Sequence, residues 1–334
     1  MTAFLELRHV TKVFSRGLWR KKRTVALEDI SFAISTEPPE VKVVAGESGS
    51  GKTTLGLILM GFLSPTGGEV LYQGKDVHRL TRSERRQFRR EVQAVFQDPF
   101  SVYNPFYKVD HVLSTPIAKF KLAKSQTAAR ALMEEALVGV GLRPEETLGQ
   151  YPHQLSGGQR QRVMVARALL MKPRLIIADE PVSMVDASLR ATILESLRKL
   201  NQDFGISILY ITHDLTTAYH IGHDILVLYR GSVAEAGEAA RVIKNPQHPY
   251  TQLLINSIPW PDIKRKWNLA RSEAVKEGVT LTTNQGCKFA DRCPHRMPVC
   301  AEKLPPLFQT GDRHAVSCYL YQDSGIIELS RKAA

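Results

Sequence analysis

The chain has 334 residues, of which 43% are hydrophobic and 23% are charged, proportions typical of a folded globular protein. This length suffices for one large domain and a smaller one, and no apolar run approaches the roughly 18 residues of a membrane-spanning helix. The formal net charge of +12 permits contact with nucleic acid, anionic lipid or phosphorylated ligands, although a solvated basic face is the commoner meaning of such clusters.

The amino-terminal part is predicted to be rich in strands. Apolar residues alternate at Leu5, Leu7 and Val10, which indicates a strand rather than a secretion signal. Further strands are predicted over residues 26–34 and 41–45. A glycine-rich loop follows at once, and residues 54–63 have the length and composition of a helix.

The middle of the chain changes character twice. Thr81 and Glu84 form a capping box at the start of a basic helix, and a short strand is predicted over 92–96. Helical periodicity dominates from 98 to 156, most clearly over 128–140. Beyond Gly157, helices alternate with apolar strands at 175–178, 207–211 and 225–228. This alternation predicts a mostly parallel sheet covered on both faces, with residues 98–156 as a helical insertion.

Residues 46–53 read Gly-Glu-Ser-Gly-Ser-Gly-Lys-Thr and fit the phosphate-loop pattern in full, between a strand and a helix. The glycines let backbone N–H groups turn inward around phosphate oxygens, and the helix N-terminus adds a favourable dipole. We expect Lys52 to reach the β- and γ-phosphates of a nucleotide and Thr53 to ligate magnesium. The nucleotide-binding residues predicted here are Gly46, Glu47, Ser48, Gly49, Ser50, Gly51, Lys52, Thr53 and Thr54.

Two carboxylates end the apolar strand Leu-Ile-Ile-Ala-Asp-Glu at residues 175–180. Asp179 stands where a phosphate-loop enzyme holds magnesium. Glu180 is placed to orient the attacking water or to accept its proton. An acidic turn would be the simpler interpretation, but the phosphate loop elsewhere in the chain favours the catalytic one.

A second glycine-rich motif, Leu-Ser-Gly-Gly-Gln, occupies residues 155–159. Ser156 can cap a helix, and the two glycines leave backbone N–H groups uncovered, which makes a second anion site at a helix N-terminus. One γ-phosphate does not need two such sites. We therefore expect this motif to serve a nucleotide on a partner subunit, through Ser156, Gly157, Gly158 and Gln159.

The phosphate loop, the Leu-Ser-Gly-Gly-Gln motif and the Asp-Glu pair, in this order, resemble the ATP-binding subunit of an ABC transporter, over nearly the whole chain. The resemblance implies an α/β fold: a P-loop NTPase core of the RecA-like type with an antiparallel β subdomain and a helical subdomain at about 98–160. These would form a nucleotide-binding domain of residues 1–245. A small C-terminal domain with cysteines would follow at 246–334.

The resemblance also implies roles for single residues. Phe14 matches the aromatic residue that stacks on adenine. Gln97 matches the glutamine that joins magnesium to the membrane-subunit contact. His213 matches the histidine that contacts the γ-phosphate. The loop at 183–186 matches the segment that meets the partner, although Met184 and Val185 replace its usual Ala-Leu; Asp186 is kept.

The carboxyl-terminal part narrows the resemblance to the oligopeptide/dipeptide importer ATPases. The segment His-Pro-Tyr-Thr at 248–251 and the spacing of the cysteines are similar to that family's tail. Phe100-Ser101, Asn104-Pro105 and the segment 180–183 resemble the second, F-type, of its two ATPase subunits, and so does Gln159, where the first type usually has Met.

All four cysteines lie in the final fifth of the chain. A cytosolic chain rarely uses such residues as disulfides, and four thiolates suit zinc or an iron–sulfur cluster. Their spacing is looser than that of common zinc ribbons, and buried free thiols remain a third interpretation. The family resemblance implies a 4Fe-4S cluster ligated by Cys287, Cys293, Cys300 and Cys318, with zinc as the second choice.

The function predicted from these features is an ATPase subunit that binds ATP and Mg2+ and drives import of di- or oligopeptides. The expected partners are a second ATPase subunit, more plausibly a paralogue than a second copy, two membrane permease subunits and an extracellular solute receptor. The expected location is the cytoplasmic face of the cell membrane, without nucleic acid. Alternatives are an importer of oligosaccharides or metal chelates, an exporter ATPase, and a soluble ATPase acting on nucleic acid or ribosomes.

Overall fold

The structure is a computed structural model that describes residues 3–16, 22–98, 103–183, 185, 187–258 and 286–327. Four strands near the amino terminus form a small antiparallel sheet in the order β2-β1-β4-β5. Their bounds are β1 (Leu5–Arg16), β2 (Lys22–Ile34), β4 (Gly67–Tyr72) and β5 (Lys75–Asp76). Strands β1 and β2 were expected from the alternation of apolar residues, whereas β4 and β5 were not.

The second sheet has eight strands in the order β11-β12-β10-β9-β3-β8-β7-β6. Strands β6, β7, β8, β3 and β9 run parallel, and β10, β12 and β11 extend them antiparallel. The bounds are β3 (Val41–Ala45), β6 (Val92–Val95), β7 (Leu175–Asp179), β8 (Ser207–Thr212), β9 (Asp224–Tyr229), β10 (Ser232–Glu238), β11 (Phe308–Gly311) and β12 (His314–Val316). The α/β fold with a largely parallel central sheet is confirmed.

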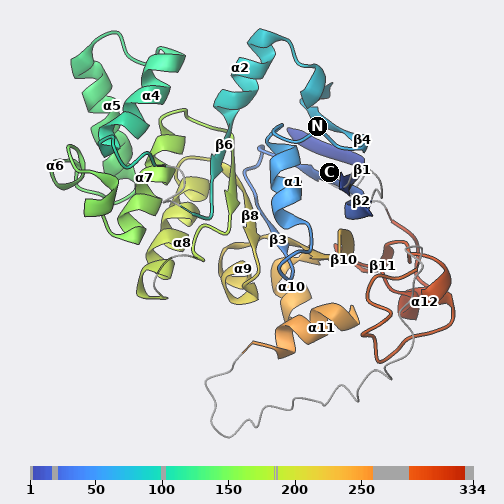
Figure 1. Cartoon of the computed structure of the whole chain (residues 1–334). Coiled ribbons are helices and arrows are strands. Elements are labelled where there is room, and N and C mark those ends of the chain that lie inside the picture. Colours follow the sequence, from blue (N-terminus) through green and yellow to red (C-terminus); the bar gives the residue numbers. More distant parts are fainter. Residues whose placement is uncertain are drawn as a thin grey trace, which may run out of the picture.

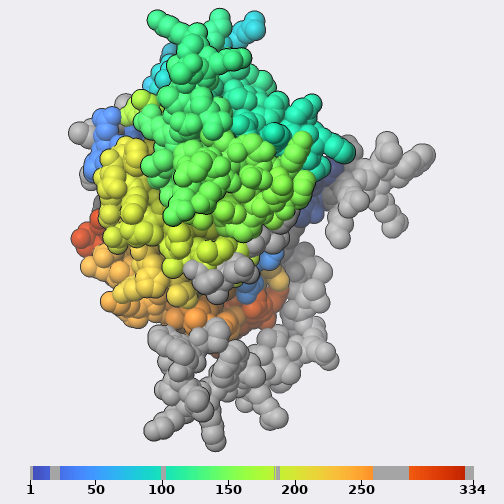
Figure 2. Space-filling model, turned by 90° about the vertical axis from the view of Figure 1, so that its left-hand side faces the viewer, coloured from blue at the N-terminus to red at the C-terminus, as the bar shows by residue number. Residues whose placement is uncertain are grey.

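Helices gather on one side of the molecule, between β6 and β7 in sequence (Figure 1). Seen from that side, this helical segment covers one end, and the C-terminal segment lies at the other (Figure 2). The helical segment contains α4 (Val109–Phe120), α5 (Gln126–Gly139), α6 (Pro144–Thr147) and α7 (Gly157–Leu169). Helix α5 matches the strongest helical periodicity in the sequence, and Ser125 caps it by accepting a hydrogen bond from the Ala128 N–H at 3.1 Å.

The remaining helices lie beside the two sheets or in the C-terminal part. They are α1 (Lys52–Leu59), α2 (Arg82–Glu91), α8 (Ala187–Gln202), α9 (Leu215–Ile221), α10 (Ala239–Lys244), α11 (Pro249–Asn256) and α12 (Val299–Glu302). The predicted capping box of α2 is confirmed: the Thr81 hydroxyl accepts from the Glu84 N–H, and the Glu84 carboxylate accepts from the Thr81 N–H at 2.9 Å. Among the described residues, no helix is long and apolar enough to cross a membrane.

The apolar core has two parts that share the central sheet. One contains α1 and the amino-terminal strands, with Leu55, Val44 and Ile211 buried together. The other contains the helical segment and the opposite side chains of the same strands, such as Val43, Ile176 and Tyr210. Because successive strand residues point to opposite faces, burial on both sides explains why these strands read as continuous apolar runs.

Some sequence predictions fall outside the described residues. These include Phe100 and Ser101 of the F-type features, and Met184 and Asp186 of the partner-facing loop.

Candidate functional site

The predicted catalytic residues follow the carboxyl ends of neighbouring parallel strands. Gly46 follows β3, Gln97 comes two residues after β6, Glu180 follows β7, and His213 follows β8. Since β6, β7, β8 and β3 are consecutive in the sheet, these residues meet at one edge. The carboxyl edge of an open parallel sheet is the usual position of a ligand site.

The phosphate loop needs its glycines for conformation and for space. Gly46 has φ +152°, and a Cβ there would lie 2.2 Å from the carbonyl oxygen of Leu228. Gly51 has φ +104°, and its Cβ would lie 2.5 Å from the carbonyl oxygen of Ala26. Side chains are therefore excluded at both positions by sterics as well as by backbone strain. The loop ends where α1 begins, at Lys52, so the helix N-terminus faces the loop.

The Lys52 side chain packs against the phosphate loop. Its side chain is 5% exposed, and its Nζ donates to the carbonyl oxygens of Gly46 and Glu47 at 2.8 and 3.0 Å. Burial lowers the pKa of Lys52, and the carboxylates of Glu180, Asp179 and Glu47 oppose that shift. The ammonium group is thus held inside the loop by backbone carbonyls, where phosphate oxygens could replace them.

Glu180 is the point on which the other catalytic candidates converge. Gln97 donates through Nε2 to the Glu180 carboxylate at 3.1 Å, and His213 Nδ1 lies 3.1 Å from the same oxygen. Lys52 Nζ lies 4.0 Å from the other carboxylate oxygen. Glu180 has φ +46°, a conformation that is uncommon for residues other than glycine and occurs often at functional sites.

Asp179 and Thr53 have the arrangement expected of magnesium ligands. Asp179 is buried, and its Oδ1 has no hydrogen-bond partner, although its carboxylate accepts from the Thr53 hydroxyl. Burial raises the pKa of Asp179, which that hydrogen bond opposes. A buried carboxylate oxygen without a donor is costly, and a hard divalent cation bound by oxygen ligands would satisfy it. The two residues therefore fit a Mg2+ ion.

The second glycine motif lies at the start of α7 and forms a capping box. Ser156 Oγ accepts from the Gln159 N–H at 3.2 Å, and Gln159 Oε1 accepts from the Ser156 N–H at 2.8 Å. Gly158 is buried against Leu189 of α8, whereas Ser156 is exposed. Among the described residues, no hydrogen bond or ion pair joins this motif to the phosphate loop.

The first turns of α7 form two hydrogen bonds with residues that follow β6 in the sequence. Gln161, fully buried in α7, donates through Nε2 to the carbonyl oxygen of Phe96, the residue before Gln97, at 3.2 Å. The Tyr103 hydroxyl donates to the carbonyl oxygen of Arg160 at 2.7 Å. Sequence reasoning did not identify Gln161, since a polar residue within a helix gives no signal of a distant partner.

Phe14 lies on β1 and is 43% exposed, with Lys12 Nζ 5.2 Å from the centre of its ring. An exposed ring on a strand is compatible with stacking on a planar ligand.

The phosphate loop also contacts the C-terminal part, which was not predicted. Tyr250 accepts a hydrogen bond from the Glu47 N–H, and Arg292 pairs with the Glu47 carboxylate. Tyr250 belongs to the His-Pro-Tyr-Thr segment, but the sequence gave no indication of its partner.

The four cysteines are free and lie in one region. The Cys287 N–H donates to the carbonyl oxygen of Cys300 at 2.8 Å, and Cys318 lies within electrostatic range of the other three sulfurs. Backbone N–H groups donate to sulfur at Cys287, Cys293 and Cys318. Even so, no three His, Cys, Asp or Glu side chains in the described part of the chain are arranged to hold a metal ion. The donor chemistry fits a thiolate-bound group, but the geometry does not.

Comparison with known proteins decides the family. The ABC transporter family matches residues 27–183, and the oligopeptide/dipeptide transporter C-terminal region matches residues 234–300. The chain is 40% identical to the "Probable peptide ABC transporter ATP-binding protein y4tS" of Sinorhizobium fredii, over 92% of this chain and 86% of that protein. It belongs to the ABC transporter ATP-binding proteins.

Two further similarities agree. The dipeptide transport ATP-binding protein DppF of Escherichia coli is 38% identical, over 91% of this chain and 90% of that protein. A dimeric, post-hydrolysis ATP-binding cassette bound to ADP and phosphate superimposes with a TM-score of 0.61 at 31% identity, over 70% of this chain and 98% of the cassette. The chain is thus an ABC-type ATPase, an ATP-hydrolysing subunit of a transporter.

Proposed function

We propose that this ABC ATPase binds and hydrolyses ATP at the carboxyl edge of its central sheet. The observation that carries the proposal is the convergence of Lys52, Gln97 and His213 on the Glu180 carboxylate, beside the phosphate loop. In the proposed site, the N–H groups and side chains of residues 46–54 bind the phosphates, and Phe14 stacks on adenine.

Within this site Glu180 is the proposed base for the attacking water. A carboxylate within hydrogen-bond reach of a water can orient it or accept its proton. His213 and Gln97, both at 3.1 Å from Glu180, would hold that carboxylate in place and contact the γ-phosphate and the metal shell. Thr53, Asp179 and Gln97 would hold Mg2+, which when bound offsets the negative charge of the phosphates.

The experiment that tests this site is a Lys52→Ala substitution in the full chain, with ATP binding measured directly. Loss of the buried ammonium group from the loop should weaken ATP binding on the order of 100-fold, since it removes a charge-assisted contact at a partly desolvated site. Lys244→Ala is the matched control, because Lys244 packs on the Tyr219 ring with its Nζ 5.4 Å from the ring centre and has no contact with the loop. Equal binding in both variants would exclude the proposed site.

We propose further that the site is completed by a second ATPase subunit. Ser156, Gly157, Gly158 and Gln159 have no link to the phosphate loop of their own chain, and the similar cassette was solved as a dimer. An exposed helix N-terminus suits the γ-phosphate of a nucleotide on another chain. A paralogue is the proposed partner, on the F-type features of the sequence.

The proposed transport reaction is uptake of di- or oligopeptides. The proposal is supported by two relatives, a probable peptide transport protein of Sinorhizobium fredii and a dipeptide transport protein of Escherichia coli, and by the matching C-terminal region. Vesicles containing this chain, its partner ATPase and its permeases, supplied with the receptor, should accumulate labelled dipeptide in an ATP-dependent manner. Uptake of labelled oligosaccharide but not of peptide would contradict this proposal and identify oligosaccharides as the substrate class.

A docking surface for a permease is proposed at an exposed aromatic patch of the helical segment. Phe106, Tyr107 and Tyr151 are 86%, 51% and 36% exposed, and Lys108 Nζ lies 6.0 Å from the centre of the Tyr151 ring. Exposed aromatic residues are enriched at protein interfaces. The patch would attach the ATPase to the cytoplasmic face of the membrane through its permeases. Phe106→Ser with Tyr107→Ser should abolish co-purification with the permeases, whereas Phe204→Ser, at a similarly exposed residue elsewhere, should not.

For the C-terminal part we propose a 4Fe-4S cluster on Cys287, Cys293, Cys300 and Cys318. Its support is the gathering of four free cysteines with backbone N–H groups donating to three of the sulfurs. Such hydrogen bonds stabilise thiolates, but burial acts in the opposite direction and raises the pKa of all three thiols, so a bound metal would have to offset that cost. The cysteines would have to draw closer around the cluster. Anaerobic purification with iron and sulfide assays should give four of each per chain, whereas a colourless protein with stoichiometric zinc would exclude the cluster.

The proposed division of the chain is a nucleotide-binding domain at 1–245 and a C-terminal domain at 246–334. The C-terminal strands β11 and β12 nevertheless continue the central sheet through β10. Limited proteolysis tests the division, because a stable fragment ending near residue 245 is expected only if the first domain folds independently.

A further inference from the structure

We propose that Tyr250 and Arg292 are positioning residues of the nucleotide site, through which the C-terminal part of the chain sets ATP affinity. Both act on Glu47, the second residue of the phosphate loop. The inference rests on the proposed nucleotide site and adds to it a pair of residues outside the nucleotide-binding motifs.

The contacts with Glu47 involve its backbone and its side chain. The Tyr250 hydroxyl accepts a hydrogen bond from the Glu47 N–H at 2.8 Å. The Arg292 guanidinium donates through both Nη atoms, at 3.1 and 3.2 Å, to the two oxygens of the Glu47 carboxylate. Such a fork-to-fork pair fixes orientation as well as distance. Three hydrogen bonds therefore define where this part of the loop lies.

Both positioning residues are held by a packed aromatic cluster. Tyr250 is fully buried, and its ring lies 4.4 Å from that of Tyr229 and 5.6 Å from that of Phe289, between centroids. The Arg292 guanidinium lies 5.6 Å from the Phe289 ring centre and 5.8 Å from that of Tyr229. Because packing restricts these side chains, they can hold Glu47 at little additional entropic cost.

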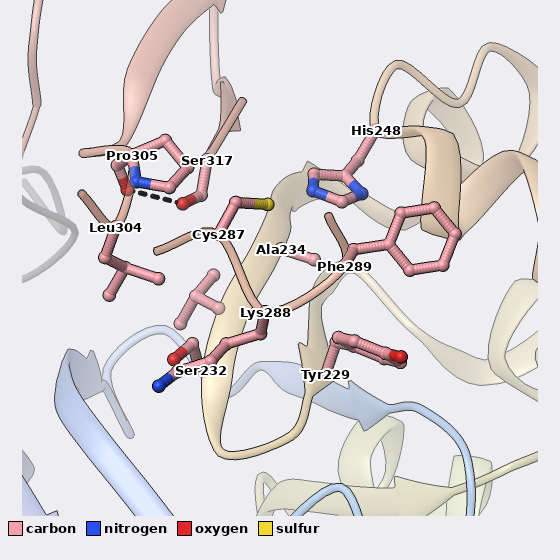
Figure 3. A pocket seen from close by; sticks show the side chains of 11 residues that line it. Tyr229, Ser232, Ala234, His248, Cys287, Lys288, Phe289, Leu304, Pro305 and Ser317 are labelled. Atoms are coloured by element: carbon pink, nitrogen blue, oxygen red, sulfur yellow. Dashed lines mark hydrogen bonds between the residues drawn. The ribbon is translucent and has the colours of Figure 1, made fainter. Parts of the chain in front are cut away.

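The segment that carries Arg292 is anchored at a second point. Lys288 Nζ lies 2.6 Å from the Glu28 carboxylate on β2, and Lys288 is only 16% exposed. Figure 3 shows Lys288 and Phe289 next to Cys287, with Tyr229 and His248 nearby. The stretch between Cys287 and Cys293 thus joins the amino-terminal sheet to the phosphate loop. A change in the positions of these cysteines would therefore alter the position of Glu47.

The physical effect concerns charge. Glu47 places a carboxylate in the loop proposed to bind a triphosphate, and like charges repel each other. Arg292 neutralises that carboxylate and holds it in one orientation. Without Arg292, the Glu47 carboxylate would be unpaired and would weaken ATP binding, whereas loss of both charges would remove the repulsion.

The test is ATP binding by the full chain, measured by calorimetry at low and high salt, for four variants. Arg292→Ala should raise the Kd for ATP roughly threefold to tenfold at low salt, and less at high salt, because salt screens exposed charges. The double variant Glu47→Gln with Arg292→Ala should bind ATP more tightly than Arg292→Ala alone, because it also removes the unpaired carboxylate. Arg292→Lys, which keeps the charge without the fork, should fall between. Tyr250→Phe, which removes only the hydroxyl, should raise the Kd without changing its salt dependence.

The matched control is Arg313→Ala. Arg313 also ties the C-terminal part to the sheet, at 2.7 Å from Asp224, but it has no contact with the phosphate loop. Its removal should leave the Kd unchanged. An unaltered Kd in Arg292→Ala, or a double variant as weak as the single one, would overturn the inference. Failure of the proposed nucleotide site itself would appear separately, as normal ATP binding by Lys52→Ala. If Arg292→Ala does not fold, Tyr250→Phe and Arg292→Lys decide the question alone.

Discussion

The two glycine-rich motifs proposed as anion sites, residues 46–53 and 155–159, have different surroundings. The phosphate loop gathers partners from its own chain: Asp179, Glu180 and, from the far end of the sequence, Arg292. The start of α7 is satisfied by its own capping box, between Ser156 and Gln159, and among the described residues no hydrogen bond joins it to the phosphate loop. The phosphate loop is surrounded by side chains that could bind a ligand. The capping box, by contrast, bonds within the described part of the chain only to backbone groups of its own helix, so we expect its ligand to come with another molecule.

We interpret this difference as two halves of different nucleotide sites carried by one chain, in line with the proposed shared site. Lys52 and Asp179 are already buried in the first half, as we expect of groups proposed to bind phosphate and metal. The exposed Ser156 shows that the second half is prepared only as a helix terminus. In the proposed shared site, one subunit binds ATP by itself, whereas hydrolysis depends on an assembly. The predictions below test this division in order of expected effect.

The largest expected effect is on ATP turnover at the phosphate loop and Glu180, the half of the site that has its ligating groups in place. Glu180→Gln should slow ATP turnover at least about 100-fold while leaving ATP bound, because the amide keeps the shape but cannot accept the proton of water. Steady-state ATPase activity and ATP-dependent dimer formation measure the two parts. Glu134→Gln, in a surface pair with Arg130 on α5, is the matched control. Unchanged turnover in Glu180→Gln would remove Glu180 from its catalytic role.

The incomplete half can be tested without disturbing its helix. Asp is as good an N-cap as Ser, so Ser156→Asp should keep the cap while adding a negative charge opposite the partner's phosphates. Activity of the partner's site should fall by about tenfold or more, with ATP binding at this chain's own loop unchanged. Thr81→Asp makes the same change at α2, where it should affect neither. The shared site would be contradicted if an isolated Ser156→Asp monomer lost ATP binding at its own loop as strongly as the partner's site loses activity.

The capping boxes also separate stability from function. Ser156→Ala and Thr81→Ala should each cost about 1 kcal/mol of unfolding free energy, since each leaves a backbone N–H at a helix N-terminus without its acceptor. Only Ser156→Ala should also lower ATPase activity. Urea unfolding and ATPase assays on the two variants give the comparison. A loss of activity in Thr81→Ala as great as in Ser156→Ala would mean that general stability accounts for both.

The smallest expected effect is a difference in how the stability of the two capping boxes, Thr81–Glu84 and Ser156–Gln159, depends on pH. Hydrogen bonds from Lys75 and from Thr81 lower the pKa of Glu84 to about 2, from an ordinary 4.5. A depressed carboxylate pKa stabilises the fold above the unfolded value and loses that contribution as the pH falls through the folded one. The stability difference between wild type and Glu84→Gln should therefore shrink from about pH 4.5 towards pH 2. Ser156→Ala should show no such trend, because Gln159 does not ionise. Urea unfolding against pH measures both, and a pH-independent Glu84→Gln difference would contradict the interpretation.

Much of the site could be predicted because its signals are local. The phosphate loop is recognisable because Gly46 and Gly51 adopt backbone conformations that other residues rarely adopt. The glycines that this requires stand close together in the sequence. The strand over 41–45 and the capping boxes were predictable for the same reason. Strands β10, β11 and β12 were not predicted. The β10 sequence Ser-Val-Ala-Glu-Ala-Gly-Glu has few of the β-branched and aromatic residues typical of strands, and β11 and β12 have only four and three residues.

The sequence by itself determined the phosphate loop, the Asp-Glu pair, the helix caps and the alternating pattern of the α/β core, all of which depend on neighbouring residues. Tertiary structure alone decided that Gln97 and His213 meet at Glu180, and that Tyr250 and Arg292 hold Glu47 from 203 and 245 residues away. No periodicity or motif reports a contact at such separation, because it exists only once the sheet has brought the strand ends and the C-terminal part together.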